Sequence, residues 1–248
     1  MMLRLLPLLF LLLLLPQRGE AQQEDEIVAD VSSRHIAVTA GFNGATTTLF
    51  GALPREGEVI IVVTGPLSDV IVRRKERYMG LWLNRSSASF HAVPGFYWVA
   101  SSKPLADMAS SEFLSEKRIG IEHLRFTIAE ASNLQESALF QKALVEIKTQ
   151  EEDYSARPAM VSIMGGRLYR ADLSLPSGAP TGEYLITTYL LRSGRLLEVQ
   201  QTPLVLRKEG AMAAVSAIAV RHSLFYALGA VFLALFSGWL SAALMQRR

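Results

Sequence analysis

The sequence contains no cysteine among its 248 residues. This absence excludes disulfide bridges, thiol nucleophiles, covalently attached c-type haem, and zinc or iron–sulfur sites with cysteine ligands. Histidine is also scarce, with only four residues, and none lies two, three or four positions from another histidine. Because a histidine-based metal site needs such spacing, we expect no metal. The four are His35, His91, His123 and His222.

Motifs for nucleophilic catalysis and for phosphate binding are missing as well. The pairs Ser86-Ser87 and Ser110-Ser111 lack the G-x-S-x-G context of a nucleophile elbow, and Gly165-Gly166 is a lone turn. We therefore expect neither enzymatic activity nor a cofactor. Catalytic residues can still meet in space from distant parts of a chain, so a hydrolase with dispersed residues stays open as an alternative.

The chain has little charge imbalance outside its ends. Residues 22–210 carry 20 Lys and Arg against 22 Asp and Glu, a net charge of −2. The basic isoelectric point of about 8.9 therefore comes from the two terminal segments. Because nucleic-acid binding needs a basic face, we expect no nucleic-acid partner.

What the sequence does have is one long uncharged run near its carboxyl end. Residues 223–245 are 23 residues without Asp, Glu, Lys or Arg. As a helix they would extend about 34 Å, enough for a hydrocarbon core of about 30 Å. A core helix would be shorter and amphipathic, so we predict a transmembrane helix over 223–245. Residues 211–222 would form a juxtamembrane segment and residues 246–248 a cytoplasmic tail.

The amino-terminal residues 1–21 have the pattern of a secretory signal peptide. Arg4 precedes an apolar stretch over residues 5–15, and Gly19-Glu20-Ala21 places small residues at a cleavage site. Arg247 and Arg248 at the other end favour a cytoplasmic carboxyl terminus. Together these features predict a single-pass protein whose domain, residues 22–210, lies outside the cytoplasm.

Short strands separated by turns dominate residues 22–210. The run Val59 to Thr64 is apolar and β-branched, as in a central strand buried on both faces. Residues 168–175 alternate, with Tyr169, Ala171, Leu173 and Leu175 on one face. In Gly182-Glu183-Tyr184 we expect the tyrosine hydroxyl to bond to backbone at a strand entry. We predict a mainly β fold, an antiparallel Ig-like β-sandwich.

A helical insertion is expected at about residues 104–153. Ser132 and Gln135 have the spacing of a capping box. After them, Phe140, Ala143, Leu144 and Ile147 recur at helical spacing. The sequence therefore predicts one substantial helix inside a β domain.

Several short motifs occur in a characteristic order. They are Phe42-x-Gly44, Phe50-Gly51-Ala52, Gly65-Pro66, Val72-Arg73-Arg74-Lys75, Gly80-Leu81-Trp82-Leu83-Asn84, Val93-Pro94-Gly95-Phe96-Tyr97, Leu175-Pro176, Pro180-x-Gly182-x-Tyr184 and Gly238-Trp239. From about residue 27 to its end, the chain resembles a transmembrane protein family of the Alphaproteobacteria whose function is not established. The resemblance implies a bacterial inner-membrane protein that faces the periplasm. It brings no active site.

The basic cluster at residues 73–77 is the strongest candidate for a binding site. A strand would place Arg73 and Lys75 on one face and Arg74 on the other. One interpretation is an edge strand whose charges prevent strand addition. The other is an anion or peptide site walled by nearby aromatic side chains. The candidate ligand-binding residues are Arg73, Arg74, Lys75, Trp82, Asn84 and Tyr97.

Within the predicted membrane helix, small residues recur every four positions at Ala230, Ala234, Gly238 and Ala242. Such a stripe allows close helix packing, although alanine-rich composition alone could produce it. We expect a non-enzymatic accessory or interaction module for a membrane partner such as a transporter, or for a second copy of the chain. The alternative is a periplasmic domain that binds or senses a small anion or peptide.

Overall fold

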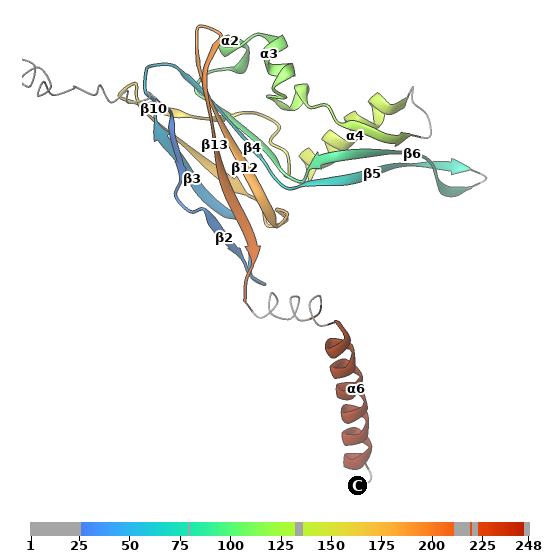
Figure 1. Ribbon diagram of the computed structural model, residues 1–248. Coiled ribbons are helices and arrows are strands. Elements are labelled where there is room, and N and C mark those ends of the chain that lie inside the picture. Colours follow the sequence, from blue (N-terminus) through green and yellow to red (C-terminus); the bar gives the residue numbers. More distant parts are fainter. Residues whose placement is uncertain (1–25, 79, 132–135, 211–218, 220–222, 246–248) are drawn as a thin grey trace, which may run out of the picture.

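The computed structural model describes residues 26–78, 80–131, 136–210, 219 and 223–245 (Figure 1). Its strands form three sheets, whose orders are β1-β3-β11-β10, β2-β13-β12-β4-β7-β9 and β5-β6-β8. The mainly β character predicted from the sequence is confirmed. The predicted segments 1–21 and 246–248, and all of 211–222 except residue 219, lie outside the described residues.

The four-stranded sheet is antiparallel throughout. It contains β1 (Val28–Val31), β3 (Ala45–Ala52), β11 (Leu168–Leu175) and β10 (Ser162–Met164). Along β11 every second side chain is buried, beginning at Tyr169, which confirms the predicted alternation. This periodicity gives the sheet one apolar face, which has to be buried against another layer of the protein.

The six-stranded sheet packs on this apolar face. It contains β2 (His35–Val38), β13 (Arg195–Lys208), β12 (Gly182–Arg192), β4 (Glu58–Thr64), β7 (Tyr97–Ser101) and β9 (Ala159–Met160). Its interior pairs are antiparallel, but β2 pairs with β13, and β9 with β7, in parallel. A purely antiparallel arrangement was therefore a wrong expectation at both edges. Short edge strands reached by a crossover, rather than a hairpin, can pair in this way.

The two sheets pack face to face around one hydrophobic cluster, which takes side chains from β3 and β11 on one side and from β4, β7, β12 and β13 on the other. Strand β4 is buried from Val59 to Val63. Val59, Ile61 and Val63 face this cluster, whereas Ile60 and Val62 join a second cluster on the opposite face. The prediction of a central strand buried on both faces is confirmed. The immunoglobulin-like topology stays a prediction.

Short helices cover the second face of the six-stranded sheet. They are α2 (Leu105–Met108), α3 (Ser111–Glu116) and the 3-10 turn η1 (Ile121–His123). Met108, Leu114 and Ile119 pack there against Tyr97 and Tyr154. The sheet therefore has a β layer on one face and a helical layer on the other (Figure 1).

The third sheet is a long hairpin supported by a helix. Strands β5 (Leu67–Tyr78) and β6 (Leu81–Pro94) pair along their length, and β8 (Thr127–Ala131) adds to β6. Helix α4 (Ser137–Gln150) buries Phe140 and Leu144 against the hairpin, whereas Ile147, predicted on the same face, is exposed. The predicted capping box at residues 132–135 lies outside the described part. The stretch 104–153 thus holds a strand as well as helices.

The predicted corner before β12 is confirmed. Tyr184 is buried, and its hydroxyl donates to the Pro180 carbonyl at 2.7 Å. Its ring also lies 5.7 Å, centroid to centroid, from that of Phe96 on β7. These contacts fix where β12 enters the sheet.

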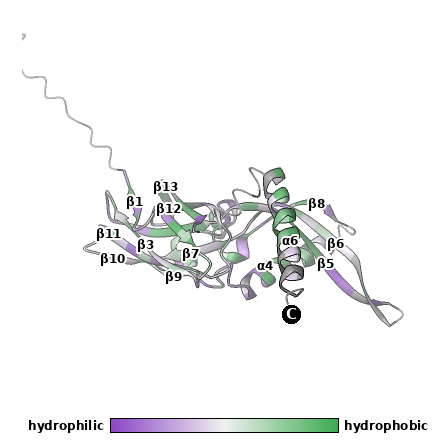
Figure 2. Ribbon diagram, turned by 90° about the horizontal axis from the view of Figure 1, so that it is seen from below, coloured by the Kyte–Doolittle hydropathy of each residue, from purple (hydrophilic) through white to green (hydrophobic). Residues whose placement is uncertain are grey.

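Helix α6 (Ser223–Met245) occupies the predicted residues 223–245 and carries no charged residue. Hydrophobic colouring prevails along it in Figure 2, and large apolar side chains such as Leu235, 70 % exposed, lie on its surface. Among the residues that the structure describes, no helix combines the length and apolar character needed to cross a bilayer. The helix is confirmed, and its passage through a membrane stays a prediction.

Candidate functional site

The basic cluster lies on the outer part of the β5–β6 hairpin. Strand β8 pairs only with Ala88 to His91 of β6, close to the base. Beyond Val72, which pairs with Ala88, no strand among the described residues adds to the hairpin; we name residues 73–78 and 81–87 the basic ribbon. Figure 1 shows it extending past α4, and Figure 2 shows hydrophilic colouring along its β5 strand. Strand β5 is an edge strand, as the edge-protection interpretation requires.

Strand alternation divides the three cations between two sides of the ribbon. Arg74 lies on the side of α4, where its Nη2 is 3.0 Å from Glu136 Oε2 and its guanidinium lies 5.9 Å from the centre of the Phe140 ring. These contacts attach α4 to the hairpin. Arg73 and Lys75 belong to the opposite side of β5 and are exposed. The three residues therefore do not form a single cationic clamp.

Of the other predicted site residues, Trp82 and Asn84 lie on the basic ribbon, but Tyr97 does not. On β6, Trp82 pairs with Arg77 and Asn84 with Lys75, but their side chains lie outside the described set. Tyr97 is on β7, in the core under the short helices. Its hydroxyl donates to the Arg118 carbonyl and accepts from the Gly120 N–H, both at 2.8 Å. Tyr97 thus supports the loop after α3 and not the basic ribbon.

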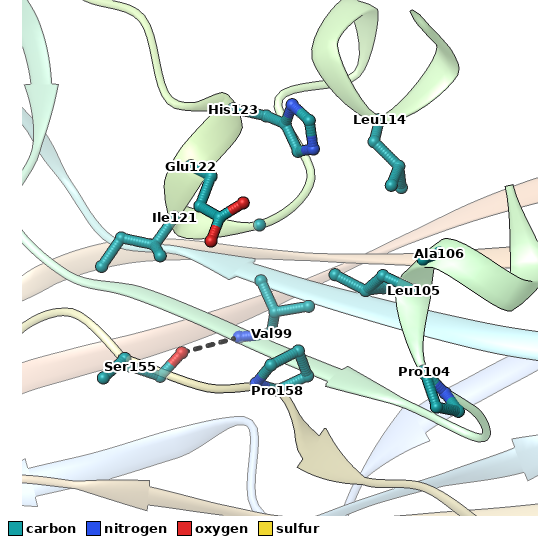
Figure 3. A pocket seen from close by; sticks show the side chains of 12 residues that line it. Val99, Pro104, Leu105, Ala106, Leu114, Ile121, Glu122, His123, Ser155 and Pro158 are labelled. Atoms are coloured by element: carbon teal, nitrogen blue, oxygen red, sulfur yellow. Dashed lines mark hydrogen bonds between the residues drawn. The ribbon is translucent and has the colours of Figure 1, made fainter. Parts of the chain in front are cut away.

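A pocket of about 360 Å³ opens between the helical layer and β7 (Figure 3). Its walls are mainly apolar, with Val99 on the sheet and Leu105 and Leu114 from the helices. Three polar residues also line it, but the Ser155 hydroxyl accepts from the Val99 N–H at 3.2 Å and so belongs to the sheet edge. Figure 3 shows His123 and Glu122 on the opposite wall. The arrangement suits a small apolar group.

A second pocket, of about 280 Å³, has a different chemistry and was missed at the sequence level. Lys117, Arg118 and Arg125 line it together with Thr187 and Tyr189. These residues come from the end of α3, the segment after η1, and β12. No motif links them, because they meet only when the helical layer covers the sheet. We name it the cationic pocket.

Contacts between titratable side chains elsewhere serve the fold. His91 Nδ1 lies 2.8 Å from Asp69 Oδ2 across the base of the hairpin, and this contact, with a bond from the Ala92 N–H, holds the pKa of Asp69 below its usual value. Lys148 on α4 lies 2.7 Å from Asp153. Within the described ranges, no cluster of three or more His, Asp or Glu side chains could hold a metal ion.

The small residues predicted to form a packing face lie on α6. Ala230, Ala234 and Gly238 are exposed, and a Cβ placed on Gly238 would meet no atom within 4 Å. The Ala242 side chain lies outside the described set. The stripe is thus open to a partner helix along the part that the structure describes.

Comparison with known protein families gives a match over most of the chain. A family model described as "Putative transmembrane protein (Alph_Pro_TM)" matches residues 26–247. No curated protein matches the chain.

Proposed function

The chain belongs to this alphaproteobacterial family of transmembrane proteins, and on that basis we propose that it is a single-pass protein of the bacterial inner membrane. Residues 22–210 would face the periplasm after removal of the signal peptide at 1–21. They would serve as a non-enzymatic accessory or interaction module for a membrane partner such as a transporter.

Helix α6 is the proposed membrane anchor. Its 23 residues include Phe232, Leu233 and Leu235, each at least 67 % exposed. Exposed apolar side chains on every side of a helix are unfavourable in water and favourable in lipid. The uncharged composition and the family membership support the same assignment.

The single observation that carries the interaction role is the basic ribbon. A two-stranded hairpin is at best marginally stable in water, and among the described residues a third strand pairs only with the base of this one. The ribbon presents exposed Arg73, Lys75 and Arg77, beside an open strand edge. A projecting element of this kind gains stability from a partner with acidic groups. The alternative, binding of a small anion or peptide, has its support in the cationic pocket.

Topology is tested with reporters and protease. A reporter fused after Arg248 should be active only in the cytoplasm, and protease added to the periplasmic side should digest residues 22–210. A domain that resists protease until the inner membrane is opened would contradict the proposal.

The interaction role is tested by photo-cross-linking in the intact bacterium. A photoreactive residue at position 73 or 75 should give a discrete adduct with a membrane protein. The same residue at Arg167, an exposed arginine before β11 on the other sheet, is the matched control and should give none. With the photoreactive residue at position 73, charge reversal by Lys75→Glu with Arg77→Glu should abolish the adduct. Equal adducts from positions 73 and 167, or none from the ribbon, would refute the role.

A further inference from the structure

The cationic pocket lies where three parts of the fold meet. Its floor is the face of the six-stranded sheet that carries Val62 and Thr187, and its sides come from the loop after α3 and the base of the β5–β6 hairpin. Buried Pro94 and Leu124 and half-buried Phe126 give it apolar walls. A ligand held here would contact apolar and cationic groups at once.

The charge in this pocket is of one sign. Three cations line it, and no Asp or Glu is among the described lining residues. Lys117 also contacts Glu116 at 2.8 Å, but that carboxylate is 70 % exposed and lies outside the pocket. Arg118 and Arg125 have no carboxylate partner among the described residues, and unpaired cations beside a partly apolar cavity favour an anion.

Hydrogen-bond donors remain available on the residues that line the pocket. Arg125 donates through Nη1 to the carbonyls of Glu122 and Leu124, at 2.9 and 2.8 Å, which fixes the guanidinium in place. In the described part of the chain, its Nε and Nη2 donate to no protein acceptor, and the Arg118 guanidinium forms neither an ion pair nor a hydrogen bond. The hydroxyl of Thr187, a residue only 9 % exposed, likewise has no hydrogen-bond partner there.

The backbone at Arg118 adds a separate observation. Arg118 has φ of 54°, immediately after α3 and its C-cap Lys117. The N–H groups of Ile119 and Arg118 bond to the carbonyls of Leu114 and Ser115, which is the Schellman ending that glycine usually occupies. A non-glycine residue costs free energy here, and such strain tends to accumulate at functional sites. The Tyr97 hydroxyl holds the strained carbonyl in place.

We propose that the cationic pocket binds a small organic anion, with its carboxylate or sulfonate head on Arg118, Arg125 and Lys117 and its apolar body against Leu124 and Phe126. This inference is independent of the interaction role of the basic ribbon. The volume of about 280 Å³ sets the size of the ligand. A cavity of about 150 Å³ accepts benzene, so one aromatic ring with a carboxylate fits here. Benzoate is therefore a suitable probe.

The test is benzoate binding to the full-length protein in detergent, measured by calorimetry or ligand-observed magnetic resonance. Benzoate should bind saturably, and added sodium sulfate should weaken binding. Benzyl alcohol has a similar shape but no charge, and should bind at least about tenfold more weakly. No saturable benzoate binding up to about 20 mM, or equal binding of the two probes, would overturn the proposal.

Arg118 variants separate binding from folding. Arg118→Gly removes the cation and relieves the backbone strain, so it should unfold at the same temperature or higher and still raise the Kd for benzoate about tenfold. Arg118→Lys should retain most of the binding. Ser193→Gly is the matched control, because Ser193 has φ of 50° in the turn between β12 and β13 and does not line the pocket. It relieves similar strain and should leave the Kd unchanged. If Arg118→Gly binds benzoate as the unmodified protein does, the site is not where we place it.

Discussion

The replacement Tyr97→Phe tests how the short helices are held on the sheet. It removes one hydroxyl and leaves the ring, which is buried in the core under α3. That hydroxyl connects two backbone groups of the loop after α3, the Arg118 carbonyl and the Gly120 N–H. No other described group bonds to this N–H, so the replacement leaves it without a partner.

The expected loss follows from these two hydrogen bonds, both of 2.8 Å. Each bond contributes about 1 kcal/mol net, and an unpaired, half-buried N–H adds a desolvation penalty, for a total of about 2–3 kcal/mol. Tyr184→Phe is the matched control, because its hydroxyl makes a single bond to the Pro180 carbonyl and its loss should cost about 1 kcal/mol.

Urea denaturation of a soluble fragment spanning residues 26–210 measures both variants. With an m value of about 2 kcal/mol/M, the midpoint for Tyr97→Phe should fall by about 1 M, and that for Tyr184→Phe by about half as much. Equal urea midpoints for the two variants would refute the view that the Tyr97 hydroxyl stabilises the loop after α3.

Other predictions concern pH, close packing and the membrane helix. Burial raises the pKa of four tyrosines above that of the unfolded chain, so stability should be complete below about pH 10 and fall as pH rises further; phenolate absorbance from these four side chains that appears before unfolding would contradict this. The tyrosines are Tyr97, Tyr154 and Tyr184, and also Tyr169, whose pKa is raised to about 12. Gly51→Ala would drive a Cβ into the Val28 carbonyl oxygen and should cost at least about 3 kcal/mol in urea denaturation, whereas Gly178→Ala meets no atom within 4 Å and should be neutral. Gly238→Leu should abolish cross-linking of α6 to a partner helix, whereas Leu240→Ala, about 200° round the helix from Gly238, should not; unchanged cross-linking in both would mean that the stripe is only composition.

Elements with strong local patterns were predictable from the sequence. Strand β4 is a run of β-branched residues with both faces buried, and β11 alternates regularly. The Tyr184 corner also has the expected hydroxyl contact. Each of these features depends on residues that are neighbours in the sequence. A strand buried on both faces is a continuous apolar run, and a strand buried on one face alternates between apolar and polar residues, so each can be recognised locally.

Features that depend on distant pairing were not predictable. Strand β8 lies in a stretch expected to be helical, and its pairing partner on β6 is about 40 residues away. The parallel edge strands β2 and β9 are short and have no sequence signal of direction. Lys117, Arg118 and Arg125 are exposed, and only the packing of the helical layer on the sheet brings them around one pocket.

The different positions of Arg74 and Tyr97 show why the candidate ligand-binding set had to be divided. Proximity in sequence grouped Arg74 with Arg73, but a strand sends neighbouring side chains to opposite faces, so Arg74 holds α4 while Arg73 faces solvent. Tyr97 lies far along the chain from the cationic pocket's arginines, yet it lines that pocket and bonds to the Arg118 backbone. We expected the aromatic ring of Tyr97 to line a ligand-binding site. The hydrogen bonds show that its hydroxyl positions the backbone of Arg118 and Gly120. Tyr97→Phe should therefore weaken benzoate binding as well as stability, and Tyr184→Phe should affect stability alone.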